Sequence, residues 1–183
     1  GLLFEAGCNI LDAQQFGDEE SGRFFLRVHF DMASAGEEPA VRGRLQRLGE
    51  VYAMDWQLHD AGRRARLLVL VSKQGHCLND LLFRTHSRQL RADIVAVASN
   101  HDDFAALAGS YGVPFHHLPV SDANRAEQEA AILDVMARGG AEYLVLARYM
   151  QVLSEDLSAK LSGRCINIHH SFLPGFKGAK PYH

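Results

Sequence analysis

A short run of consecutive apolar residues, Leu-Leu-Val-Leu-Val at positions 67–71, constrains the fold of this chain more than any other feature. A strand that is apolar at every position is buried on both faces, as in a parallel sheet covered by helices. Two further largely apolar runs, at 93–99 and 143–147, have the same character. Helical patterns and two shorter strands lie between and after the runs: helices at 78–88, 102–111, 123–138 and 154–161, strands at 115–118 and 164–168. The alternation predicts an α/β fold, a doubly wound parallel-sheet domain over residues 66–183.

The preceding part of the chain predicts a smaller domain over residues 1–60. Its pattern indicates the end of a helix at 1–7, strands at 9–16 and 23–30, a helix at 39–48 and a last strand at 52–58. The order helix-strand-strand-helix-strand is that of a ferredoxin-like βαββαβ unit lacking its first strand. We therefore expect the chain to be incomplete at its N-terminus. A polar, basic segment at 60–66 separates the two predicted domains.

Composition and charge argue against several classes of protein. Nineteen basic against 22 acidic residues give a net charge of -3, whereas nucleic-acid binders usually carry a basic excess. No apolar run is long enough to span a bilayer, and the first residues do not form a signal peptide, although a leader could have been lost because the chain does not begin with Met. The three cysteines are too widely spaced for a disulfide framework or a CxxC metal pair. We expect reduced thiols and a cytoplasmic protein with neither membrane nor nucleic-acid partners.

Ligands of doubly wound sheets bind beyond the carboxyl ends of the strands, which singles out residues 72–77, 147–153 and 167–171. Asn167 and His169 are two positions apart at the end of the last predicted strand, so their side chains share one face. An amide can donate to a developing oxyanion and an imidazole can move a proton near neutral pH. The pair therefore suits attack on a carbonyl group. Taken alone, such a pair is more often a hydrogen-bonded histidine at a strand end than a catalytic pair.

A metal site is the main alternative for the histidines, because His169 and His170 could act with His116, His117 and His183. Adjacent residues on a strand face opposite ways, so His169 and His170 are poorly placed to share an ion. No acidic residue stands at a ligand spacing nearby. We expect no metal.

The two other segments suit an anion and a flat ring. Residues 72–77 join a strand to a helix N-terminus, which attracts anions, but a single glycine makes an ordinary turn an open alternative. Apolar residues at 150–153 could wall a ring whose polar edge is recognised by backbone groups, or could simply pack in the core.

These segments resemble, in the same order, those of the formyltransferase-like hydrolases and transferases that use 10-formyltetrahydrofolate. The resemblance is strongest in the run Cys-Ile-Asn-Ile-His-His-Ser-Phe-Leu-Pro at 165–174 and its continuation at 175–183; 146–154 resembles the family's folate-pocket segment and 1–60 resembles an ACT domain. It implies a C-terminally incomplete catalytic domain that lacks the family's third catalytic residue, an Asp expected beyond His183. The site residues that it implies are Asn167 and His169 as catalytic groups; Met150, Gln151, Val152 and Leu153 as folate contacts; Ser72, Lys73, Gly75, His76 and Cys77 as a loop near the active site; and Ser171, Lys177 and His183 as further candidates.

The loop at 72–77 departs from the related transferases that act on glycinamide ribonucleotide. Their loop is richer in glycine and small polar residues and grips the acceptor's phosphate, whereas here Lys73, Gln74, His76 and Cys77 replace most of those residues. The loss leaves water as the acceptor. The resemblance then implies hydrolysis of 10-formyltetrahydrofolate to formate and tetrahydrofolate, with formate supplied to purine biosynthesis. Gln151 stands where some relatives carry Arg, which puts a charge contact there in doubt.

Three alternatives remain open: a folate-dependent formyltransferase, a non-catalytic sensor of folate and an amino acid, and an inactive piece of an active enzyme. The resemblance also implies a homo-oligomer in which ACT-like domains pair and bind an amino-acid effector. It implies no metal or redox cofactor, because folate is the substrate.

Overall fold

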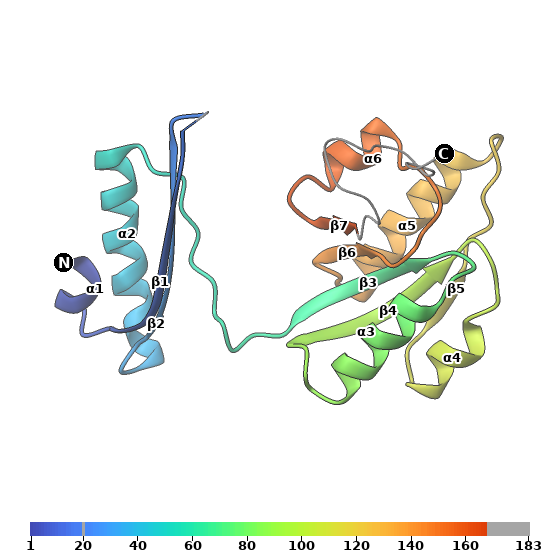
Figure 1. Cartoon of the computed structure of the whole chain (residues 1–183), viewed down its shortest axis with the longest axis horizontal. Helices are drawn as coiled ribbons and strands as arrows, with labels where there is room; N and C mark the ends of the chain where they lie inside the picture. The colour runs from blue at the N-terminus through green and yellow to red at the C-terminus, as the bar shows by residue number, and fades with distance from the viewer. Residues whose placement is uncertain (20, 168–183) are drawn as a thin grey trace. The chain divides into compact units, whose positions relative to one another are not determined.

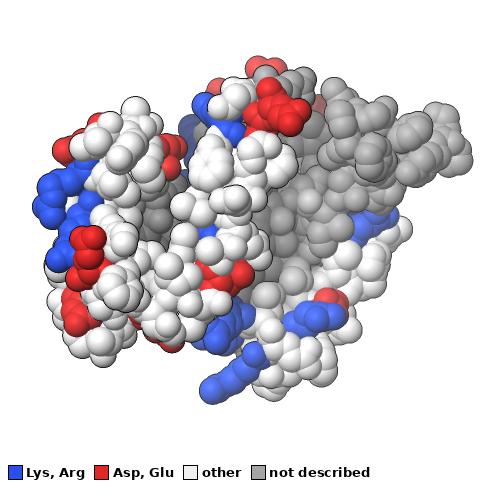
Figure 2. Space-filling view, turned by 60° about the vertical axis from the view of Figure 1, so that its left-hand side comes forward, with Lys and Arg blue, Asp and Glu red and all other residues white. Residues whose placement is uncertain are grey.

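The computed structural model describes residues 1–19 and 21–167, which form two compact units, Gly1–Asp60 and the part that follows from Ala61 (Figure 1). Within these described residues no helix is long and apolar enough to cross a membrane. Basic and acidic side chains are interspersed over the face drawn in Figure 2, without a continuous stretch of one sign among the residues coloured there.

The second unit is built on a five-stranded parallel sheet, as the apolar runs predict. Its strand order is β5-β4-β3-β6-β7, so the chain begins in the middle and winds outward on both sides. The strands are β3 (Ala65–Val71), β4 (Ala92–Ser99), β5 (Phe115–His117), β6 (Tyr143–Leu146) and β7 (Cys165–Asn167). The helices between them are α3 (His76–His86), α4 (Ala105–Ser110), α5 (Arg125–Gly139) and α6 (Glu155–Lys160).

The core of this unit lies on both faces of the sheet. Every residue of β3 from Leu67 to Val71 is at most 6% exposed, which confirms that this run is buried on both faces. Leu68 and Leu70 pack with residues of α5 and α6, whereas Leu67, Val69 and Val71 pack with residues of α3 and α4. Figure 1 shows the two helix pairs on opposite sides of the sheet.

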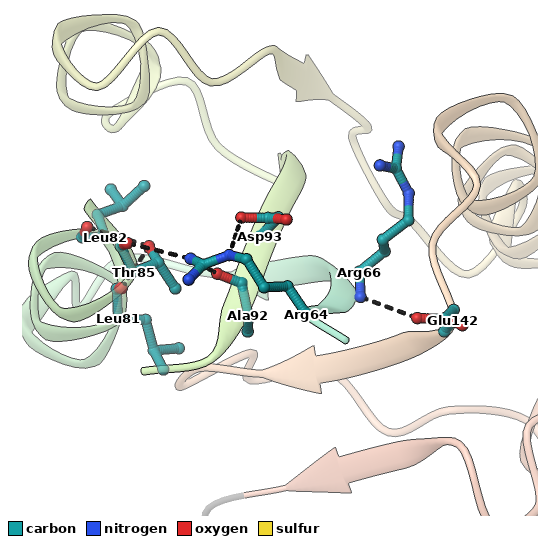
Figure 3. A network of polar contacts seen from close by, with 8 residues as sticks. All are labelled: Arg64, Arg66, Leu81, Leu82, Thr85, Ala92, Asp93 and Glu142. Carbon is teal, nitrogen blue, oxygen red and sulfur yellow. Dashed lines mark hydrogen bonds and ion pairs between the residues drawn. The ribbon is translucent and has the colours of Figure 1, made fainter. Parts of the chain in front are cut away.

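A polar network holds the start of β3 at the amino edge of the sheet (Figure 3). The Arg64 guanidinium donates to the Asp93 carboxylate at 2.6 Å and to the backbone carbonyls of Ala92 and Thr85. The Arg66 backbone N–H donates to the Glu142 carboxylate at 3.1 Å. The basic segment that the sequence marks as a boundary is thus anchored to the second unit on both sides of β3.

The first unit contains α1 (Leu2–Glu5), an antiparallel hairpin of β1 (Asn9–Asp18) and β2 (Arg23–Asp31), the short 3-10 helix η1 (Ala35–Glu37) and α2 (Glu38–Tyr52). The helix end, both strands and the helix that follows are where the sequence predicts them. The chain turns at Gly7 with φ 70°, a conformation that favours glycine.

The strand predicted at 52–58 is wrong. Helix α2 continues to Tyr52 and ends at Ala53 with φ 51°, where the Met54 N–H donates to the Gly49 carbonyl at 2.8 Å. Trp56 then folds back so closely on Gly49 that a Cβ there would lie 2.7 Å from its ring. Alternating apolar residues indicate burial on one side, but a strand also needs a neighbour to pair with. Among the described residues β1 and β2 pair only with each other, so 52–58 has no such neighbour.

Candidate active site

The three segments singled out by the sequence begin at the carboxyl ends of neighbouring strands. Ser72 follows β3, Ala147 follows β6, and Asn167 is the last residue of β7. The sheet places β6 between β3 and β7, with Leu146 opposite Asn167. Asn167 is exposed at this edge. The other predicted residues of the last segment, His169, Ser171, Lys177 and His183, lie outside the described residues.

Ser72 ties the ends of three strands together. It is only 3% exposed, and its hydroxyl donates to the Asn100 side-chain oxygen at 2.8 Å while accepting the Met150 N–H at 3.0 Å. Its own backbone N–H donates to the Arg148 carbonyl at 3.3 Å. A single buried side chain thus fixes the loops that follow β3, β4 and β6 relative to each other.

A second contact joins the loops after β3 and β6. The Nε and Nη2 atoms of Arg148 donate to the side-chain oxygen of Gln74 at 3.0 and 2.6 Å. Arg148 has a φ of 61°, in the left-handed region that side chains other than glycine rarely adopt. Such strain is maintained only where the surroundings fix the backbone, and here Ser72 holds the carbonyl of Arg148 while Gln74 holds its side chain.

The loop from Ser72 to Cys77 lies directly against a ring. A Cβ on Gly75 would be 2.3 Å from Cε1 of Phe104, although the φ of Gly75, -93°, is open to any residue. The glycine is therefore required for space and not for backbone conformation. Lys73 and His76 are exposed. Cys77, in the first turn of α3, packs against the hydrophobic core.

The segment Met150–Leu153 combines exposed side chains with three backbone N–H groups that no described residue pairs. Met150 and Val152 are 48% and 80% exposed, and only Leu153 packs against the core. The alternative that these residues simply pack in the core therefore holds for Leu153 alone among the four. Within the described part of the chain, the backbone N–H groups of Gln151, Val152 and Leu153 have no hydrogen-bond partner. Among the described residues, the segment thus presents unpaired donors next to apolar side chains.

Helix α5 holds this segment with three polar side chains. Arg125 donates to the Val152 carbonyl at 2.7 Å, and Gln128 donates to the Tyr149 hydroxyl at 2.7 Å. Glu129 accepts the Ser154 N–H at 2.8 Å and also the Ser154 hydroxyl. The same hydroxyl accepts the Leu157 N–H and caps α6. Gln128 and Glu129 are buried, at 7% and 9% exposure.

Burial raises the pKa of Tyr149 from its ordinary value, and the negative charge of Glu129 adds to this. The bond from Gln128 and the positive charge of Arg125 act in the opposite direction. Burial alone raises the pKa of the Cys165 thiol, which lies in β7. Both groups therefore stay protonated at neutral pH.

Sequence reasoning missed the residues that hold the site, namely Asn100, Arg125, Gln128, Glu129 and Arg148. The sequence does contain a signal for the three of them that lie on α5. Positions 125, 128 and 129 share one face of a helix, and the same face continues with the buried residues Ile132, Val135 and Met136. Polar residues on the buried stripe of an amphipathic helix indicate a specific polar contact.

The described residues hold no group of three or more His, Cys, Asp or Glu side chains that could bind a metal ion. His169, His170 and His183 are not among them, so the absence of a metal stays a prediction. The three cysteines, all within the described part, are free thiols.

A model of the formyl transferase family matches residues 65–183, and the chain belongs to this family. Over its whole length it is similar to proteins named formyltetrahydrofolate deformylase. It is 48% identical to the formyltetrahydrofolate deformylase of Corynebacterium sp. (strain P-1), over 100% of this chain and 64% of that protein. The crystal structure of formyltetrahydrofolate deformylase from Burkholderia mallei superimposes with a TM-score of 0.89 at 49% identity, over 100% of this chain and 65% of that one.

The phosphoribosylglycinamide formyltransferase of Coxiella burnetii is less similar. It has a TM-score of 0.56 and 28% identity, and the match covers 63% of this chain and 56% of that one. The two deformylases thus match both units, whereas this formyltransferase matches a part of the chain about the size of the second unit. The chain spans 64% of the length of the Corynebacterium relative.

Proposed function

We propose that the protein hydrolyses 10-formyltetrahydrofolate to formate and tetrahydrofolate. One observation supports this most strongly: Asn167, the Met150–Leu153 segment and the Ser72–Cys77 loop follow three neighbouring strands at one edge of the sheet. The similarity over the full chain to proteins named formyltetrahydrofolate deformylase supports the reaction.

In this mechanism water adds to the formyl carbon, and the carbon–N10 bond then breaks. The Asn167 amide donates to the carbonyl oxygen and stabilises the negative charge of the tetrahedral intermediate. His169 accepts the proton of the attacking water and later gives it to N10, so that formate and tetrahydrofolate leave. A carboxylate from an Asp beyond His183 orients the water and the imidazole. The residues in hand supply an oxyanion donor and a proton carrier, so the mechanism requires no metal or redox cofactor.

The Met150–Leu153 segment binds the pterin ring of the folate. A flat heterocycle with donors and acceptors along one edge suits a strip of backbone groups flanked by apolar side chains. The N–H groups of Gln151, Val152 and Leu153, which no described residue pairs, can serve as donors to such an edge. The exposed side chains of Met150 and Val152 are available to cover the ring.

The Ser72–Cys77 loop favours water over a phosphorylated acceptor. Backbone wrapping of a phosphate requires a flexible loop with several glycines. Here the only glycine, Gly75, lies against Phe104, and the Arg148 guanidinium binds Gln74. Both contacts restrict the loop and occupy groups that a phosphate would need.

The first unit acts as an ACT-like regulatory domain of the ferredoxin-like type. Its helix, hairpin and second helix follow the expected order, apart from the last strand. Several apolar side chains of the hairpin are exposed, including Phe16 at 64% and Phe24 at 65%. Burial of such residues against another copy favours a homo-oligomer with an amino-acid effector at the interface. A role in purine biosynthesis then follows from the formate that is released.

The reaction is tested by measuring formate release from 10-formyltetrahydrofolate by the full-length protein. We expect His169→Ala and Asn167→Ala each to lower kcat by about 100-fold or more, the usual loss when an oxyanion donor or a proton carrier is removed. Asn79→Ala serves as the matched control, because Asn79 is an exposed residue of α3 without a role in the mechanism. Unchanged rates in His169→Ala would refute the role of the imidazole.

Adding glycinamide ribonucleotide separates the hydrolase from the transferase. A hydrolase forms tetrahydrofolate at the same rate with and without it, and a large acceleration would establish a transferase instead. Folate binding without any turnover would establish a sensor.

A further inference from the structure

One face of α5 carries three polar residues that all contact the same loop. Arg125, Gln128 and Glu129 stand at intervals of three and four residues, and their partners are Val152, Tyr149 and Ser154. Gln128 and Glu129 fix the two ends of a loop whose middle is Met150–Leu153. We infer that Gln128 and Glu129 are positioning residues, which set the backbone of Met150–Leu153 for folate binding without touching the reacting atoms. This inference rests on the proposed function.

The position of Glu129 argues for a role beyond stability. A buried carboxylate that forms no ion pair within the described residues is expensive to desolvate, and an apolar residue of similar size often gives an equally stable core. The same stripe of α5 continues with Ile132, Val135 and Met136, which shows that apolar residues suit this face. Both oxygens of Glu129 are instead used on one residue, the backbone N–H and the hydroxyl of Ser154. Such a bidentate contact specifies one backbone conformation.

Gln128 fixes the other end of the loop. Its amide donates to the Tyr149 hydroxyl, and both side chains are buried. Tyr149 itself belongs to the core cluster formed with β3, β6, α5 and α6. Tyr149, which precedes Met150, is therefore held against α5 by packing and by a hydrogen bond. Ser154, which follows Leu153, is held by its two bonds to Glu129.

Loss of either contact should act on substrate binding more than on chemistry. Between the two fixed ends, three consecutive N–H groups are held ready without a partner in the described residues. If an end is released, the segment samples other conformations, and the substrate has to order it on binding. The apparent affinity falls by the fraction of molecules in the competent conformation. Asn167 is on β7 and does not contact α5 through any of these bonds, so kcat changes little.

The test compares Glu129→Gln and Gln128→Met with Glu127→Gln in the full-length protein. Glu129→Gln replaces an acceptor of two bonds by an amide whose NH2 cannot accept, and Gln128→Met keeps the shape while removing the donor. Glu127→Gln makes the same chemical change as the first variant on an exposed position of the same helix. Steady-state kinetics with 10-formyltetrahydrofolate give KM and kcat, and titration with tetrahydrofolate gives the affinity for the product.

We expect Glu129→Gln to raise KM about tenfold, equivalent to about 1.4 kcal/mol, and Gln128→Met to raise it roughly threefold. In both variants kcat should stay within about twofold of the parent, as expected when only binding is affected. The affinity for tetrahydrofolate should fall in parallel, and Glu127→Gln should change neither value. Amide hydrogen exchange of residues 150–153 should be faster in the two α5 variants.

Several results would overturn the inference. One is an unchanged KM in both α5 variants, measured on folded protein. Another is a loss confined to kcat or to thermal stability, which a purely structural role would produce. If Glu129→Gln does not fold, the more conservative Gln128→Met decides alone. If the parent protein neither binds tetrahydrofolate nor hydrolyses the substrate, the proposed function fails instead, and hydrogen exchange still shows whether α5 orders the segment.

Discussion

The contact between Gly75 and Phe104 makes a strong quantitative prediction. Gly75 precedes α3, and its φ of -93° would accommodate alanine without strain. A Cβ built there would nevertheless lie 2.3, 2.5 and 3.0 Å from three carbon atoms of the Phe104 ring. Carbon atoms normally approach to about 3.5 Å, so the methyl group would be too close by about 1 Å.

The substitution Gly75→Ala combines three effects. Overpacking of this kind costs about 1–3 kcal/mol, because the ring or the start of α3 has to move. Alanine is also a poorer residue than glycine before the first turn of a helix, by about 0.5–1 kcal/mol. The reduced freedom of the unfolded chain offsets about 0.4–1 kcal/mol. We therefore expect the free energy of unfolding to fall by about 1–3 kcal/mol, nearly all of it from the clash.

A double-mutant cycle with Phe104→Leu isolates the steric effect. Equilibrium urea unfolding is measured for the parent, both single variants and the double variant. With the ring removed, the other two effects nearly cancel and Gly75→Ala should cost less than about 0.5 kcal/mol, giving a coupling energy of roughly 1–3 kcal/mol. Gly109→Ala is the matched control, because a Cβ on this glycine of α4 meets nothing within 4 Å. Strict additivity of the two substitutions would refute the close contact and with it the account of the Ser72–Cys77 loop.

Two further substitutions test the polar contacts around the site. Ser72→Ala leaves the Met150 N–H and the Asn100 oxygen without their partner, and should lower the free energy of unfolding by about 1–3 kcal/mol in urea denaturation; a change below the error of the measurement would contradict the linking role of Ser72. Tyr149→Phe tests the raised pKa. Because the folded state holds the phenolic proton more tightly, the unfolded chain loses it first as the pH rises above the ordinary value of 10.0. The protonated Tyr149 therefore stabilises the folded state fully below that pH, and this contribution disappears as the pH passes the raised pKa. The difference in unfolding free energy between the parent and Tyr149→Phe should stay constant from about pH 8 to pH 10 and shrink above pH 10.

The sheet of the second unit could be predicted because its signal is local. Five consecutive apolar residues at 67–71 have few solutions other than a strand covered on both faces, and β3 is that strand. The prediction of a strand at 52–58 failed because strand formation depends on a pairing neighbour, which is often far away in the sequence. Tyr52 instead extends α2, and Trp56 packs back on Gly49. A residue pattern describes which sides are buried but not whether a pairing partner is present.

The candidate site, like the fold, could be predicted only in part. Its location at the ends of β3, β6 and β7 followed from the general behaviour of doubly wound sheets, and Asn167 lies at that edge. The contacts that shape it join residues 21 to 78 positions apart, such as Gln128 with Tyr149 and Ser72 with Met150. No local pattern specifies such pairs. They depend on how α5 and the loops are brought together, which only the assembled core determines.

The loop after β6 is held mainly by side chains and not by secondary structure. Five residues bind it over residues 148–154: Ser72 and Gln74 on one side, and Arg125, Gln128 and Glu129 on the other. A segment fixed in this way keeps its conformation in the absence of a ligand, so less entropy is lost on binding. The left-handed backbone of Arg148, with a strain of about 1 kcal/mol or more, is consistent with this, since only an over-determined loop keeps such a residue. The arrangement favours a rigid substrate with a fixed hydrogen-bonding edge over a flexible one, because a preformed row of backbone donors can match only a ligand whose acceptors are equally fixed.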